Sequence, residues 1–126
     1  MLKITYLEDG IYLEYLSESV EAWKANRVLV SLRAGASIYT ESSTASIVLP
    51  AYTPYLAALV ELEEKKLIQI TPCDEEYLEV SLSGIWVAKS ETSEEGVFVC
   101  ELNHSSESFL YQLWQKSQVG ASVVSE

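Results

Sequence analysis

Residues 77–89 have the sequence YLEVSLSGIWVAK, in which two largely apolar segments flank a Ser-Gly pair. We predict strands over Tyr77–Leu82 and Ile85–Lys89. Between them, Ser83 and Gly84 form either a turn or a bulge within one long strand, because glycine marks both kinds of irregularity. This segment therefore supplies one or two strands to a sheet.

The N-terminal residues predict a hairpin. Two strands are expected over Leu2–Leu7 and Ile11–Leu16, with Asp9 and Gly10 in the turn between them. Asp-Gly is a strong hairpin signal because glycine accepts a positive φ. The hairpin is also rich in tyrosine, which favours strands.

The other strands are expected to be short. They are predicted at Arg27–Arg33, Ala36–Thr40, Thr44–Leu49, Leu67–Thr71 and Val97–Leu102. The hydroxyl-rich run that begins at Ser42 is interpreted as a tight polar turn between two of them. Residues 25–33 allow two interpretations, because short apolar runs are ambiguous: a strand after a short helix, or one helix that continues to Arg33.

Three helices are predicted. The first covers Ser17–Ala25. The second covers residues 54–66 and begins at Pro54, where the missing N–H is tolerated. The third covers Glu107–Gln118 and ends at Gly120, which leaves residues 121–126 as a frayed tail.

Together these elements predict the fold class. About eight short strands and two or three helices, joined mostly by short connections, indicate a mainly antiparallel sheet in an α+β domain. A chain of 126 residues suits a single compact domain over residues 1–126.

The charge of the chain excludes several classes of partner. Its 8 basic residues face 19 acidic ones, giving a net charge of -11. Such a chain is expected to bind neither nucleic acid, whose affinity depends on Lys and Arg, nor an acidic membrane surface. No signal peptide or membrane-spanning run is predicted, and two cysteines without other secretory features favour free thiols in the cytoplasm.

No catalytic or metal-binding motif is predicted. His104 is the single histidine, and Cys73 and Cys100 lack the paired spacing of zinc ligands. Carboxylates beside Cys73 disfavour its thiolate. We therefore predict no metal, no cofactor and no catalytic residues, which argues against an enzyme.

The aromatic side chains are the positive feature of the sequence. Tyr and Trp are enriched at interfaces and can line pockets. The candidate interface or pocket residues are Tyr12, Tyr15, Tyr52, Tyr55 and Trp86. The main hypothesis is a non-enzymatic interaction module that self-associates, as a homodimer.

Three alternatives stay open. The first is a small-ligand domain with a pocket between the sheet and helix 54–66, lined by Tyr52, Tyr55 or Trp86. The second is an acidic regulator that binds a basic protein partner through residues 74–79 and 91–95. The third is an enzyme that uses carboxylates with Tyr or Ser, which would need a carboxylate of raised pKa in a cleft.

Two segments resemble those of a known group of proteins. LEDGIYLEY at residues 7–15 and STASIVLP at residues 43–50 are similar to segments of small cyanobacterial proteins of unknown function. The resemblance implies a bacterial cytoplasmic protein. It implies no activity, substrate or catalytic residue.

Overall fold

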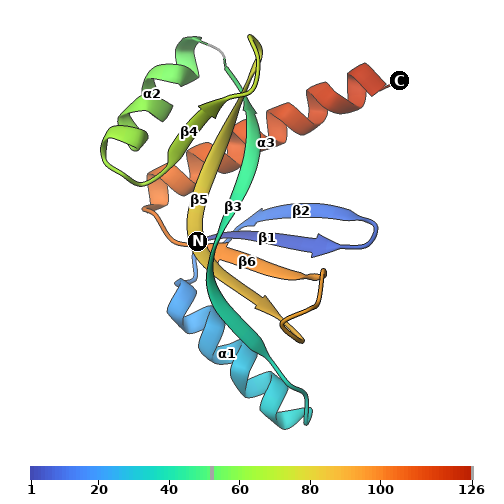
Figure 1. The fold of residues 1–126 in the computed structure, drawn as a ribbon. Coiled ribbons are helices and arrows are strands. Elements are labelled where there is room, and N and C mark those ends of the chain that lie inside the picture. Colours follow the sequence, from blue (N-terminus) through green and yellow to red (C-terminus); the bar gives the residue numbers. More distant parts are fainter. Residues whose placement is uncertain (52, 126) are drawn as a thin grey trace.

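A computed structural model describes residues 1–51 and 53–125, and these form a mainly antiparallel α+β domain (Figure 1). The elements in chain order are β1 (Leu2–Leu7), β2 (Gly10–Tyr15), α1 (Val20–Arg33), β3 (Tyr39–Pro50), α2 (Thr53–Glu64), β4 (Gln69–Pro72), β5 (Tyr77–Ala88), β6 (Gly96–Cys100) and α3 (His104–Ser125). The predicted fold class is confirmed, with six strands in place of about eight. None of the described helices combines the length and the apolar content needed to cross a membrane.

Strand β5 is the centre of the sheet. The strand order is β2-β1-β6-β5-β3, and every paired neighbour is antiparallel. Along one edge, β5 pairs with the whole of β3. Along its other edge it pairs first with β4, over Leu78–Ser81, and then with β6, over Ile85–Val87. One strand thus joins two parts of the sheet.

Gly84 lies where β5 changes partner from β4 to β6. A Cβ atom at this position would lie 2.2 Å from the carbonyl oxygen of Val99 and 2.7 Å from Cζ of Phe98. Only a residue without a side chain allows the two backbones to approach so closely. The pairing with β3 continues without interruption through Gly84, so the alternative of one long strand is confirmed, whereas the expected turn or bulge at Ser83 and Gly84 is wrong.

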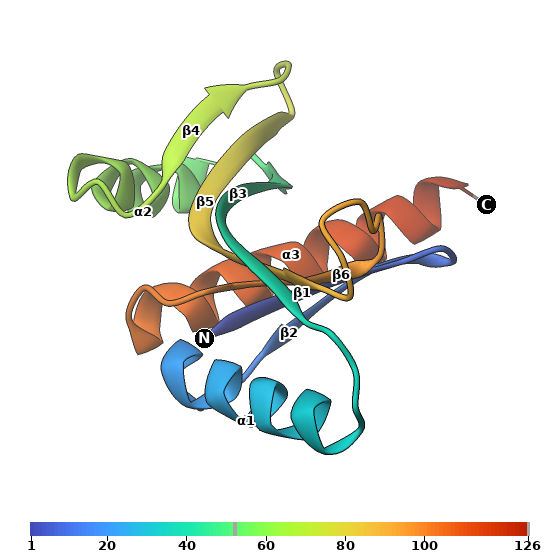
Figure 2. The same ribbon diagram turned by 60° about the horizontal axis from the view of Figure 1, so that its bottom comes forward.

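The two faces of the sheet are covered by different helices (Figures 1 and 2). Because side chains alternate along a strand, Phe98 and Cys100 face α3, whereas Val97 and Val99 face α1. On the α3 face, Leu110 and Leu113 pack into the main core, which continues under α2 through Leu59 and Leu62. On the α1 face a smaller core gathers around Trp23.

Helix α1 extends farther along the chain than the helix predicted over Ser17–Ala25. The side chain of Ser19 caps it by accepting the N–H of Ala22, at 3.1 Å. It ends at Arg33, and Gly35 follows with a φ of 67°, which allows the N–H groups of Gly35 and Ala36 to bond back to Leu32 and Ser31. The predicted strand over residues 27–33 is therefore wrong, and the alternative of one helix to Arg33 is confirmed.

Two other predicted boundaries are corrected. The two strands predicted at 36–40 and 44–49 are replaced by one, β3, which begins only at Tyr39, so the hydroxyl run from Ser42 lies within a strand and does not form a turn. Its continuous pairing with β5 overrides the local preference of serine for turns. Helix α3 passes through Gly120 and continues to Ser125, so the predicted end at Gly120 is wrong.

The role of Gly84 leads to a stability prediction. We expect Gly84→Ala to lower the free energy of unfolding by at least about 1–3 kcal/mol, since the added methyl group overlaps backbone atoms of β6. Urea unfolding followed by circular dichroism measures this change. The control is Ser83→Ala at the exposed neighbouring position, expected to stay within about 0.5 kcal/mol of the parent chain. Equal stability of the two variants would contradict the argument.

Candidate functional site

The tyrosines of the hairpin have separate surroundings. Tyr12 is exposed beside the turn, and its hydroxyl donates to Asp9 at 3.2 Å. The charge of Asp9 raises the pKa of the Tyr12 hydroxyl. Tyr15 lies on the other face of the strand, where its hydroxyl bonds the His104 ring and its own ring packs near Tyr111, with centroids 6.5 Å apart. Tyr15 therefore holds β2 against α3.

The remaining aromatic candidates lie in the core or beside it. Tyr55 packs on Phe109, with ring centroids 6.1 Å apart, and its hydroxyl accepts from Lys116 at 2.7 Å. Trp86 meets Tyr6 edge to face at 5.6 Å. Tyr52 lies outside the described residues. The described candidates are therefore not gathered into one pocket.

The space predicted to hold a pocket, between the sheet and helix 54–66, is occupied. Leu59 and Leu62 of α2 are buried in the same core as Leu49 and Val80 of the sheet. Helix α2 therefore serves as a structural cover for the sheet.

The nucleophilic side chains are also apart. Cys73 is exposed, whereas Cys100 is buried and its pKa is raised to about 12 by burial and by the nearby Glu107 carboxylate. His104 is engaged with Tyr15. Within residues 1–51 and 53–125, no group of three or more His, Cys, Asp or Glu side chains is arranged to hold a metal ion.

The acidic residues mostly serve local structure. Asp74 accepts the N–H groups of Glu76 and Tyr77, at 2.7 and 2.9 Å, and so forms the turn before β5. Glu107 is buried, with 4% of its surface exposed. Its carboxylate lies 3.0 Å from the Met1 amino group and accepts the Leu102 N–H at 2.8 Å. These contacts hold the start of α3 against β1.

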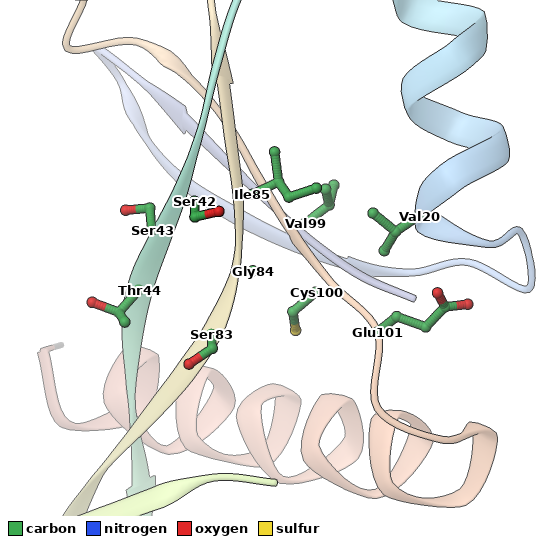
Figure 3. Close-up of a pocket in the computed structure, with 10 residues that line it drawn as sticks. All are labelled: Val20, Ser42, Ser43, Thr44, Ser83, Gly84, Ile85, Val99, Cys100 and Glu101. Atoms are coloured by element: carbon green, nitrogen blue, oxygen red, sulfur yellow. The ribbon is translucent and has the colours of Figure 1, made fainter.

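One hollow lies between the start of α1 and the face of β3 and β5 (Figure 3). It has a volume of about 590 Å³ and is open to solvent. Figure 3 shows hydroxyl side chains from both strands on one side and Val20 of α1 on the other. Glu101 is its only charged lining residue, so the hollow offers polar contacts without a cation or an acid–base pair.

A second cavity lies under the other half of α1, and we call it the α1 groove. Its volume is about 600 Å³, within the usual range for ligand sites. Strands β1, β5 and β6 form its floor, and α1 with the segment after it forms its wall. Its lining includes Lys3, Thr5, Arg27, Val30, Lys89 and Val97.

The groove exists because the core under α1 stops at Trp23. Trp23 is the last large side chain of the helix to be buried against the sheet. Farther along, α1 presents Arg27, Ser31 and Ala34 to the groove, and these do not fill the space. A helix and a sheet whose facing side chains are small or polar leave a cavity between them.

The groove gathers positive charge in an acidic chain. Three of the chain's eight basic residues line it, Lys3, Arg27 and Lys89. Lys3 is 21% exposed and lies 3.5 Å from Glu14, and the Arg27 guanidinium lies 5.2 Å from the centre of the Trp23 ring. Glu95 is the single acidic lining residue, and its carboxylate accepts the N–H of Glu8 at 2.9 Å.

The opposite side of α1 carries an exposed apolar row, which we call the outer stripe. Its members are Ala22, Ala25, Leu29 and Leu32, spaced by three, four and three residues. Leu29 is 46% exposed and Leu32 is 71% exposed. Helix α1 thus has one face over the groove and a second apolar face directed to solvent.

Sequence reasoning missed both features of α1. The outer stripe could have been found from its helical spacing, had residues 27–33 been assigned to the helix. The groove has no comparable signal, because its residues come from β1, α1, β5 and β6, which are far apart in the sequence.

Comparison with known proteins gives a family. Residues 1–118 match the family described as Alr0857-like. The chain belongs to this family. The description refers to a gene of Nostoc or Anabaena, which agrees with the cyanobacterial resemblance of the sequence. The matched part of this Alr0857-like chain includes the whole groove and the outer stripe. No curated protein and no solved structure matched it.

The two cysteines allow a direct test of the described interior. At about pH 8, we expect a disulfide reagent such as DTNB to label Cys73 quickly and Cys100 only after unfolding, because burial and the raised pKa suppress the Cys100 thiolate. Thiol release recorded at 412 nm counts the labelled groups. Cys73→Ser provides the control, and rapid labelling of that folded variant would show that Cys100 is accessible.

Proposed function

We propose that this chain is a cytoplasmic, non-enzymatic interaction module that self-associates through the outer stripe of α1. The observation that carries the proposal is the alignment of four exposed apolar residues on one helix face. Single exposed leucines are common, but an aligned apolar row marks a surface that another molecule covers. The free thiols of Cys73 and Cys100 suit a reducing compartment.

The spacing of the stripe suits a second helix. Steps of three, four and three residues are those of the positions that meet in a coiled-coil seam. The stripe lies opposite Trp23, so α1 can pair outward without losing its contact with the sheet. A helix of 14 residues is about 21 Å long, so the contact is small and we expect micromolar affinity.

The sequence of the stripe favours an antiparallel second copy. In that arrangement Ala22 meets Leu32 and Ala25 meets Leu29, so each layer pairs a small side chain with a large one. A parallel pair would place leucine against leucine and alanine against alanine. The second copy is therefore sterically complementary to the first in one orientation only.

Charge supports the same orientation. Glu21 flanks the start of the stripe and Arg33 flanks its end. In an antiparallel pair these opposite charges lie at the same end of the interface, whereas a parallel pair brings each next to its own copy. Helix α1 also carries three cations and one acidic residue, so pairing α1 with α1 keeps the acidic remainder of each chain outside the contact.

The proposal predicts a change of mass on substitution. At roughly 100 μM we expect the parent chain to be a dimer and the Leu29→Glu/Leu32→Glu variant to be a monomer, since the new carboxylates cannot be buried unpaired. Sedimentation velocity measures both masses. The control is Tyr12→Ala, which removes an exposed tyrosine of the hairpin and should leave the dimer intact.

Two results would contradict the outer stripe as the dimer interface. A parent chain that stays monomeric at this concentration would rule out the dimer. A dimer that survives the double leucine variant but is lost in Tyr12→Ala would move the interface to the hairpin, the surface suggested by the tyrosine content of the sequence.

The antiparallel arrangement has its own test. Glu21→Arg should weaken the dimer, because it places two cations at each end of the interface, and adding Arg33→Glu should restore it. The same mass measurement, repeated over a range of concentrations, gives the dissociation constants. A double variant no tighter than Glu21→Arg alone would contradict the antiparallel pairing.

A further inference from the structure

We propose that the α1 groove binds a small organic anion that has one anionic headgroup and an apolar body. This site is separate from the outer stripe, because it lies on the opposite side of α1. The inference does not depend on self-association.

The first reason is the distribution of charge. A chain of net charge -11 repels anions over most of its surface, yet three cations line one cavity. Lys3 is only 21% exposed. Its amino group lies 3.5 Å from the carboxylate of Glu14, which is itself 51% exposed. The Lys3 ammonium group attracts a ligand anion more strongly than a fully exposed lysine would, because solvent screens its charge less.

The second reason is that the competing carboxylate is already occupied. Glu95 lines the groove, but its carboxylate accepts the backbone N–H of Glu8, and among the described residues it forms no ion pair with Lys3, Arg27 or Lys89. The Arg27 guanidinium lies over the Trp23 ring, which orients it by a cation–π contact and leaves its N–H groups free to donate to a ligand. Lys3 and Arg27 thus come from opposite walls, the sheet and the helix.

The third reason is the apolar lining. Val97 and Val87 form part of the floor, and Val30 and Ile38 lie on the helix side. This combination of an apolar wall with a few charged groups is typical of small-molecule sites. A volume of about 600 Å³ suits a single small organic molecule.

A matched pair of fluorescent dyes tests the headgroup. The dye 8-anilinonaphthalene-1-sulfonate carries one anionic group, and N-phenyl-1-naphthylamine has the same apolar body without it. We expect the parent chain to bind the sulfonate at least about tenfold more tightly. Fluorescence titration measures both affinities. Equal affinities would overturn the anionic part of the proposal.

Substitutions locate the site. Lys3→Gln/Arg27→Gln should weaken binding of the sulfonate at least about tenfold and change binding of the neutral dye less than about twofold. Ser31→Trp should abolish binding of both dyes, because the indole fills the groove. Circular dichroism confirms that each variant is folded. Unchanged sulfonate binding in both variants would place the dye elsewhere and overturn the proposal.

The outer stripe provides the matched control. At protein concentrations well below the dissociation constant of the dimer, where the parent is also a monomer, the Leu29→Glu/Leu32→Glu variant should bind the sulfonate as the parent does, because these residues face away from the groove. Loss of dye binding in this variant would show that the dye sits on the stripe. Displacement of the bound sulfonate by octanoate but not by octanol would extend the result to carboxylates, and displacement by both equally would contradict recognition of the headgroup.

Discussion

The sheet depends on a close backbone contact at Gly84, which lets β5 lie directly against β6 and pair with it. A methyl group there would lie 2.2 Å from the Val99 carbonyl oxygen, well inside van der Waals contact. Because that space is empty of side chain, β5 can pair with β4 before Gly84 and with β6 after it, while β3 pairs along its full length. The hairpin of β1 and β2 is connected to β5 through β6, so the strand order depends on the pairing of β5 with β6.

The two faces of this sheet are packed unequally, and this affects how α1 is held. The main core fills the α3 side of the sheet and extends under α2, whereas the α1 side has a small core around Trp23. Helix α1 is therefore anchored near its start and covers a cavity along the rest of its length. Elements with few buried contacts open most easily, and binding surfaces are commonly drawn from them. The weakest attachment in the fold coincides with the groove and with the outer stripe.

Much of the fold could be predicted from local signals, and the errors have a common cause. The hairpin at Asp9-Gly10 and the start of helix α2 near Pro54 follow from turn and cap chemistry. Gly84 and the serines near Ser42 carry turn signals, but long-range pairing of β3 with β5 holds both segments extended. Residues 27–33 were wrongly predicted to form a strand, because apolar side chains lie on both faces of α1 and their spacing resembles the alternation of a strand. The groove could not be predicted from the sequence, because Lys3 and Lys89 are far apart in the chain and line the same cavity only once the sheet has formed.

The two faces of α1 are physically linked through one helix. A ligand in the groove would contact Arg27 and Val30 and so fill the space that leaves the second half of α1 poorly packed. Leu29 and Leu32 lie on the same turns of the helix, so any gain in the order of those turns lowers the entropy that a second copy must remove on pairing. Linkage requires the reverse effect as well: a second copy that holds the outer stripe must strengthen ligand binding by the same factor. A helix anchored near its start, through Val20 and Trp23, can couple these two events, whereas a helix packed along its whole length would lack the freedom to do so.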